Sequence, residues 1–189
     1  MTLEEQGALF EEALLQTRIA VLEGTLLRRV ADEVFEMAAA YQSDGTAFLR
    51  TGDRVNALAG FAYGLGWLDA GSRLGLLESP AVHPPDAADV CIPDSLAAHL
   101  DEKTHRYRRM LHSALTMVEA GPDEASPLRA GAEVLHSAAH FWYTDGVEHL
   151  NAGDLAGALA RFSYGYAWLD AGVRAGLFRV TGERGLFTV

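Results

Sequence analysis

The stretch Trp67-Leu68-Asp69-Ala70-Gly71 occurs again, unchanged, as Trp168-Leu169-Asp170-Ala171-Gly172. The match extends without a gap from residues 44–77 to residues 145–178, so that each residue pairs with the one 101 positions later. Of these 34 aligned positions, 19 are identical. A long internal match at one fixed spacing is the signature of a tandem duplication. The chain therefore contains the same structural unit twice.

The composition indicates a folded, acidic protein. Of the 189 residues, 49% are hydrophobic, which is enough for a sizeable core. Acidic residues outnumber basic ones by 26 to 15, and the net charge of −11 disfavours binding to nucleic-acid phosphates. Of the basic residues 14 are Arg and only Lys103 is Lys. An acidic surface with little Lys fits a halophilic protein, although a GC-rich genome would also deplete Lys.

The sequence gives no sign of a membrane segment or of export. No apolar run is long enough to cross a bilayer, and residues 1–20 carry four Glu and no basic leader region. Cys91 is the only cysteine, which excludes an internal disulfide and suits a reducing compartment. We therefore expect a cytoplasmic protein that does not bind membranes or nucleic acid.

Helical patterns cover almost the whole chain, with similar boundaries in both halves. Thr2 and Glu5 form a capping-box pattern for a first helix. Gly52-Asp53 and Gly153-Asp154 each place a helix-ending Gly before a helix-starting Asp. The predicted helices run over about residues 3–23, 25–50 and 53–74, and then over about 94–120, from 126 onward, and 154–176.

These boundaries predict an all-α fold of two tandem three-helix bundle units packed together. The first unit covers residues 1–78 and the second covers residues 94–178. Residues 79–93, which are rich in Pro, form the predicted linker between them. Residues 179–189 form a C-terminal tail, either a small hairpin or an arm.

The third helix of each unit is apolar around most of its circumference. One stripe, which includes Gly60 and Gly64, has almost no side chains, and such a stripe is tolerated where another backbone approaches closely. A second apolar face carries Tyr63 and Trp67, with Tyr164 and Trp168 at the equivalent positions. We therefore expect these two helices to be central, with the aromatic faces against the other unit or against another subunit.

The remaining polar arc of each third helix carries an acid and a base four residues apart. Asp69 precedes Arg73, and Asp170 precedes Arg174, in the order that favours an ion pair along a helix. The simpler interpretation is a pair of exposed ion pairs on a solvated arc. The functional interpretation is a recognition patch, in which the candidate binding residues are Tyr63, Trp67, Asp69, Arg73, Tyr164, Trp168, Asp170 and Arg174.

No catalytic pattern stands out from the sequence. His136 and His140 have the i, i+4 spacing of metal ligands, but no Cys or HExxH pattern accompanies them. The Arg–His spacings of some helical ribonucleases occur from Arg106 to His112 and from Arg129 to His136, about as often as chance predicts. We therefore expect no catalytic residues, no metal and no cofactor, and we favour a non-enzymatic protein over an enzyme.

The second half carries a longer pattern that points to a known family. Residues 162–178, from Phe162-Ser163-Tyr164-Gly165 to Leu177-Phe178 and preceded by Gly153-Asp154, resemble the C-terminal signature of domain of unknown function 357. The resemblance implies an up-and-down three-helix bundle in each copy and an archaeal cytoplasmic setting. It implies no activity and no catalytic residues. The duplication departs from the single-copy form of that family, so the contact between the units would replace a homodimer contact.

Two functional hypotheses follow. The first is a non-enzymatic scaffold or adaptor that binds a protein partner or forms a homo-oligomer, because helical apolar surface is in excess. The second is a small-ligand-binding protein or enzyme with a pocket between the repeats, lined by Tyr63, Trp67, Tyr164 and Trp168. A contact without a cavity favours the first. A cleft in which Asp69 or Asp170 turns inward with a raised pKa favours the second.

Overall fold

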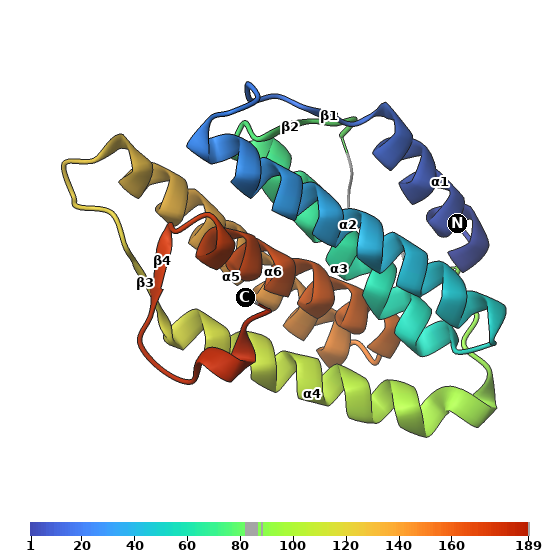
Figure 1. The fold of residues 1–189 in the computed structure, drawn as a ribbon. Helices are drawn as coiled ribbons and strands as arrows, with labels where there is room; N and C mark the ends of the chain where they lie inside the picture. The colour runs from blue at the N-terminus through green and yellow to red at the C-terminus, as the bar shows by residue number, and fades with distance from the viewer. Residues whose placement is uncertain (82–86, 88, 189) are drawn as a thin grey trace.

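The computed structural model describes residues 1–81, 87 and 89–188 and confirms an all-α fold of two repeat units (Figure 1). The helices are α1 (Leu3–Gln16), α2 (Leu26–Arg50) and α3 (Arg54–Arg73) in the first unit, and α4 (Ala97–Thr116), α5 (Pro127–Asn151) and α6 (Leu155–Arg174) in the second. Single 3-10 turns precede α4, as η1 (Asp94–Leu96), and lie in the tail, as η2 (Arg184–Leu186). Residues 82–86 and 88 of the predicted linker, and Val189 of the predicted tail, lie outside the described residues.

Side chains cap the helices where the sequence predicted them. Thr2 and Glu5 form a complete capping box at the start of α1. Asp53 and Asp154 begin α3 and α6, and each carboxylate accepts a hydrogen bond from the backbone amide three residues later, at 3.0 and 2.8 Å respectively. These bonds satisfy amide groups that have no partner inside the helix, so each third helix starts at a defined residue.

Two glycines end the central helices. Gly75 and Gly176 follow α3 and α6 with φ angles of +70° and +72°, in the left-handed region that glycine adopts without strain. The next amides, of Leu76 and Leu177, donate hydrogen bonds of 3.0 and 2.9 Å back to carbonyls in the helix. This is the Schellman arrangement. It turns the chain sharply at the same place in both repeats.

Two short strand pairs make two helices shorter than predicted. β1 (Arg18–Ile19) pairs antiparallel with β2 (Leu77–Glu78), and β3 (Val118–Ala120) pairs antiparallel with β4 (Phe178–Val180). As a result α1 ends at Gln16 instead of near residue 23, and α4 ends at Thr116 instead of near residue 120. The extended segments gain hydrogen bonds from the chain that leaves the third helix, and helical periodicity within one segment gives no sign of that distant partner.

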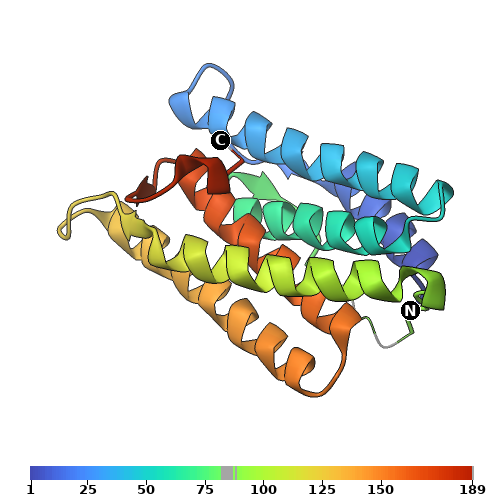
Figure 2. The ribbon, with the colours of Figure 1, turned by 90° about the horizontal axis from the view of Figure 1, so that it is seen from below.

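Helices α3 and α6 lie against each other at the centre, between α2 and α5 (Figure 2). The two helices approach closely at Gly66, where a Cβ atom would lie 2.5 Å from the carbonyl oxygen of Tyr164. On the other side of α3, a Cβ on Gly60 would lie 3.5 Å from the Cα of Gly45 in α2. The predicted approach of another backbone to the small-residue stripe is therefore found at Gly60, whereas a Cβ on Gly64 would meet the side chain of Phe10, at 2.8 Å. Both central helices are buried along most of their length.

Candidate functional site

A reciprocal pair of hydrogen bonds joins the two repeats where α3 meets α6. The Tyr63 hydroxyl on α3 donates to the Asp170 carboxylate on α6, and the Tyr164 hydroxyl on α6 donates to the Asp69 carboxylate on α3. Tyr164 and Asp170 follow Tyr63 and Asp69 by 101 residues, so the two bonds are equivalent. The contact between α3 and α6, called the seam below, therefore has an approximate twofold symmetry.

Asp170 lies entirely within the seam. It is 0% exposed, and in addition to Tyr63 it accepts a 3.2 Å hydrogen bond from the backbone amide of Thr188 in the tail. Burial raises the pKa of the Asp170 carboxyl to about 6, although the hydrogen bonds from Tyr63 and Thr188 act in the opposite direction. Burial and the Asp170 charge also raise the pKa of Tyr63 well above its ordinary value. The phenol is therefore the donor in this pair.

The expected ion pair between Asp170 and Arg174 on a solvated arc is wrong. Asp170 is buried, and the nearest guanidinium nitrogen of Arg174 lies 3.3 Å from the carboxylate of Glu33 on α2. Arg174 also donates a 3.3 Å hydrogen bond to the carbonyl of Thr188. Helix α2 and the tail cover this arc of α6. On α3, in contrast, Asp69 is partly exposed and Arg73 is exposed.

The aromatic residues of the predicted faces are buried. The ring centroids of Tyr63 and Trp67 lie 6.2 Å apart, and those of Tyr164 and Trp168 lie 6.3 Å apart, so each repeat holds the same aromatic pair. Trp168 borders a shallow groove beside α5 that Arg73 also lines. The eight candidate binding residues are therefore not brought together at one site: Arg73 and Trp168 line this groove, and Arg174 lines a different pocket beside α2.

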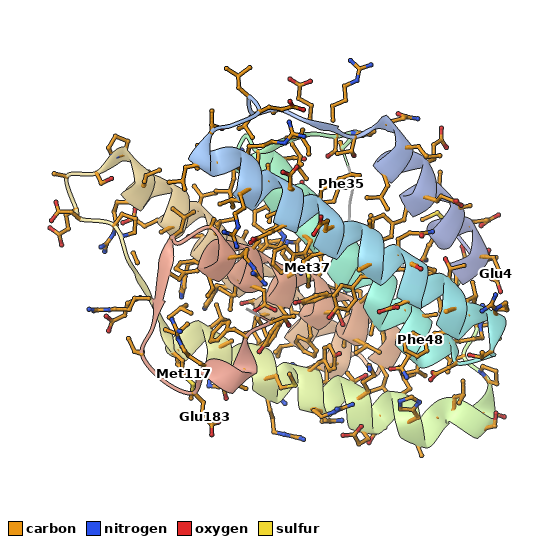
Figure 3. All side chains as sticks on the ribbon, in the orientation of Figure 1. Glu4, Phe35, Met37, Phe48, Met117 and Glu183 are labelled. Atoms are coloured by element: carbon orange, nitrogen blue, oxygen red, sulfur yellow. The ribbon has the colours of Figure 1, made fainter. Side chains whose placement is uncertain are left out.

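A cavity of about 400 Å³ lies between the two repeats, next to the seam, and is called the seam pocket below. Phe48, labelled in Figure 3, lies on α2 near α4 and forms part of its wall. Of the four aromatic residues predicted to line a pocket, Tyr63 does so, whereas Trp67, Tyr164 and Trp168 do not. The lining consists of Tyr41, Asp44 and Phe48 of α2; Asn56, Ala59, Gly60 and Tyr63 of α3; Lys103, Tyr107 and Met110 of α4; Tyr166 of α6; and residues 185–188 of the tail.

Lys103, the only lysine of the chain, forms part of this wall. It is 8% exposed, and its ammonium group donates a hydrogen bond to the side-chain oxygen of Asn56 across the gap between the repeats. The Nζ atom also lies 4.9 Å from the centre of the Tyr107 ring, within the range of a cation–π contact. None of the ion pairs among the described residues includes Lys103. Burial lowers the pKa of this amine, and the nearby charge of Arg106 lowers it further.

Neighbouring residues fix the polar groups around Lys103. The side-chain amide of Asn56 donates a 2.6 Å hydrogen bond to Asp53, the residue that caps α3, so the oxygen of Asn56 points to Lys103. The hydroxyl of Tyr107 has no hydrogen-bond partner within residues 1–81, 87 and 89–188. The pocket thus presents one amine, one oriented amide and one unpaired phenol among aromatic walls.

The C-terminal tail closes one side of the seam pocket. The Tyr166 hydroxyl donates to the carbonyl of Leu186, and the Tyr63 hydroxyl lies 3.3 Å from the hydroxyl of Thr188. The side chain of Phe187 is buried in the core. Since Thr188 also binds Asp170, the tail connects the wall of the pocket directly to the buried carboxylate of the seam.

The repeats differ in the residues that would form an equivalent pocket on the other side. Gly60 corresponds to Arg161, whose guanidinium lies 2.8 Å from the carboxylate of Asp145. Asn56 corresponds to Gly157, and Thr2 stands 101 residues before Lys103. The chemistry of the seam pocket is therefore specific to one side of the twofold arrangement.

Sequence reasoning did not identify Lys103, Asn56 or Tyr107 as site residues. A signal was present, because Lys103, Tyr107 and Met110 have the i, i+4, i+7 spacing of one helix face. A lone lysine on the same face as aromatic and apolar residues is unusual, since lysine is rarely buried. The partner helix that completes the pocket, α3, could not be assigned without the fold.

The described part of the chain offers neither a metal-ligand cluster nor a membrane-spanning helix. His136 lies 3.3 Å from the carbonyl of Leu115, and His140 is exposed. No group of three or more His, Cys, Asp or Glu among the described residues is arranged to hold a metal ion. None of the helices there combines the length and the apolar character that crossing a membrane requires.

These features define a class of protein: a duplicated three-helix bundle with reciprocal Tyr–Asp bonds between its central helices. Residues 7–77 and 106–178 match the model of the family described as "Protein of unknown function (DUF357)", and the chain belongs to this family. The two matched segments agree with the two repeats. Neither a curated protein nor a solved structure matches the chain. Because the family has no assigned function, the functional argument depends on the site itself.

Proposed function

We propose that this protein binds a small molecule in the seam pocket. The observation that carries the proposal is the only lysine of the chain, buried without a carboxylate partner at the wall of a cavity of about 400 Å³. Burying an amine costs free energy unless a partner compensates it. The oxygen of Asn56 is neutral and accepts one hydrogen bond from Lys103, so a ligand group that accepts a second one would add to this compensation.

The size and lining of the pocket support a ligand with a flat, partly apolar body. Small-molecule sites in proteins typically enclose about 300–1,000 Å³ and combine apolar walls with a few polar groups. Here Tyr41, Tyr107 and Met110 supply the ring faces and apolar surface, whereas Lys103 and Asn56 supply the polar groups. The ligand would therefore place one polar group at Lys103 and its ring against the tyrosines.

The test uses one variant that fills the pocket and one matched control. Met110→Trp places an indole in the pocket, and Leu9→Trp adds the same group on exposed α1. The purified wild-type chain is tested against a panel of aromatic acids, amides and aldehydes by thermal shift and native mass spectrometry. We expect hits that bind the wild type and Leu9→Trp but not Met110→Trp. Hits that bind all three proteins equally, or no hits at all, would contradict the proposal.

Association with a protein, either a partner or a second copy, is the second candidate function. It is supported by leucines near the start of α2, because Leu22 and Leu26 are 80% and 86% exposed. Leucine side chains left in water are typical of association surfaces when they lie close together. Light scattering after size exclusion tests self-association, which the double variant Leu22→Asp, Leu26→Asp should abolish. If the wild type is monomeric, self-association is excluded as the function.

A further inference from the structure

The amine of Lys103 lies at the wall of the seam pocket. We propose that the Nζ atom of Lys103 forms a reversible imine with an aromatic aldehyde or ketone bound in the seam pocket. This inference rests on the proposed function, because it names the chemical class of the ligand and the bond that would hold it.

An amine attacks a carbonyl carbon only when its lone pair carries no proton. Burial lowers the pKa of Lys103, and Arg106 on the same helix contributes in the same direction. Asp53 at the start of α3 and Glu102 on α4 act in the opposite direction, but neither forms an ion pair with Lys103. The net effect is a larger fraction of neutral amine near pH 7 than an exposed lysine has.

The contacts of Lys103 leave the amine available to a ligand. Its hydrogen bond to Asn56 uses one donor, and its contact with the Tyr107 ring uses no lone pair. The ring of Tyr107, 4.9 Å from Nζ, offers a surface on which a planar carbonyl compound can stack. A carbonyl group attached to that planar body would then lie within reach of Nζ.

The charge of the site favours a neutral carbonyl compound over a polyanion such as a phosphate ester. A phosphate group carries about −1.5 to −2 charges near neutral pH. The seam pocket offers Lys103 as its one cationic lining residue, while Asp44 stands exposed on the wall. The chain as a whole carries a net charge of −11. A neutral aldehyde or ketone meets no such repulsion.

The reaction balances without an oxidant or reductant. The lone pair of neutral Nζ forms a bond to the carbonyl carbon while the carbonyl π electrons move to oxygen, and a proton passes from nitrogen to that oxygen. The resulting hydroxyl leaves as water with a second proton from nitrogen, and the carbon–nitrogen double bond forms. Hydrolysis reverses the sequence and releases the ligand.

The test uses salicylaldehyde as the probe and sodium cyanoborohydride to trap the imine as a stable secondary amine. Because the chain has one lysine, peptide mapping by mass spectrometry assigns each adduct to Lys103 or to the α-amine at the chain terminus. At pH 7 we expect Lys103 in the folded protein to react at least tenfold faster than Lys103 in the same chain unfolded in urea. This comparison uses the wild type alone, so it does not depend on how any variant folds.

Two variants show whether the pocket causes the reactivity. Met110→Trp should reduce trapping at Lys103 at least tenfold, whereas Leu9→Trp should react like the wild type. If trapping at Lys103 is no faster in the folded chain than in the unfolded chain, the proposal of an imine at Lys103 is wrong. The proposal is also wrong if Met110→Trp and Leu9→Trp are trapped equally at Lys103 while both show native circular dichroism.

The same samples separate the imine from the proposed function. One outcome is that salicylaldehyde raises the melting temperature of the wild type and of Leu9→Trp, but not of Met110→Trp, without forming an adduct. In that case the imine proposal is wrong, and the proposal that the seam pocket binds a small molecule is supported. If salicylaldehyde forms no adduct, and neither it nor any compound in the wider panel binds, both proposals are wrong.

Discussion

The Tyr63 hydroxyl donates a hydrogen bond to the carboxylate of Asp170, 107 positions away along the chain and in the other repeat. The equivalent bond runs from Tyr164 back to Asp69. Each repeat thus depends on a phenol from the other to satisfy a carboxylate on its central helix. Separating the two units would therefore break both of these bonds, so the seam contributes to the stability of the whole fold.

Tyr63→Phe should destabilise the protein more than Tyr164→Phe. Both substitutions remove one hydroxyl donor, but Asp170 is fully buried, whereas water can reach Asp69. Loss of a hydrogen bond to a buried charged group costs about 1.5–3 kcal/mol. Urea unfolding at pH 8 measures the two free energies of unfolding. Equal losses in the two variants would show that the burial of Asp170 does not control the strength of its bond.

Asp170→Asn should alter the pH dependence of stability between pH 4 and pH 6. The folded carboxyl has a pKa of about 6, against 3.8 for the free group, so in this window the folded state keeps a proton that the unfolded state has lost. The contribution of Asp170 to the free energy of unfolding therefore falls as pH rises, by about 3 kcal/mol in total. The asparagine side chain does not titrate, so the variant lacks this contribution to the pH dependence of stability.

Urea unfolding of the wild type and Asp170→Asn at several pH values tests this sign. The asparagine variant should gain stability relative to the wild type as pH rises from 4 to 7, with little further change above pH 7. Tyr63 can still pair with the amide, because a hydroxyl group donates or accepts. A difference between the two proteins that does not vary with pH would contradict the raised pKa.

Gly66→Ala should destabilise the protein, whereas Gly131→Ala should stabilise it. At Gly66 a Cβ would lie 2.5 Å from the backbone oxygen of Tyr164 and 2.7 Å from the Cβ of Ala167, so α3 and α6 would have to move apart. Such overpacking costs about 1–3 kcal/mol. At Gly131 in α5 the nearest atom is 3.8 Å away, and the helix should gain about 0.5–1 kcal/mol from alanine. Thermal melting shows whether the melting temperature falls in Gly66→Ala and rises in Gly131→Ala. An unchanged melting temperature in Gly66→Ala would argue against the close contact between α3 and α6.

Trp67→Ala and Trp168→Ala should each lower the free energy of unfolding by about 3–5 kcal/mol, the range for truncating a large core side chain. Both indoles are buried, and each contacts the tyrosine of the reciprocal pair in its own repeat. Chemical denaturation measures the loss. Unfolding midpoints close to that of the wild type would show that the aromatic faces do not hold the repeats together.

The local features of the fold could be predicted because their causes lie close together in the chain. Asp53 caps α3, and Gly75 ends it, through hydrogen bonds between residues no more than five positions apart. The repeat itself followed from direct comparison of the two halves. The strands β1 and β3 could not be predicted, since each needs a partner about 60 residues away in the chain.

The site was less predictable for the same reason. The helical periodicity of α6 predicted that Asp170 lies on a solvated arc, because periodicity within one helix carries no information about the tail. In the structure Thr188 of the tail covers that arc, and its backbone amide donates a hydrogen bond to the Asp170 carboxylate. Lys103 was visible as the only lysine, but its hydrogen-bond partner, Asn56, belongs to the other repeat and could not be assigned from the sequence. Tyr63 was expected at the contact between the repeats because of the aromatic face that it forms with Trp67, and that face is a property of α3 alone.

The replacement of Gly60 by Arg161 in the second repeat has a consequence for stoichiometry. A symmetric dimer of single-copy chains would carry two identical pockets, and any change in sequence would alter both at once. In the fused chain, Arg161 can neutralise Asp145 on one side while Gly60 leaves room beside Lys103 on the other. The seam pocket should accordingly titrate as one site per chain, with a simple hyperbolic isotherm and no cooperativity between the halves.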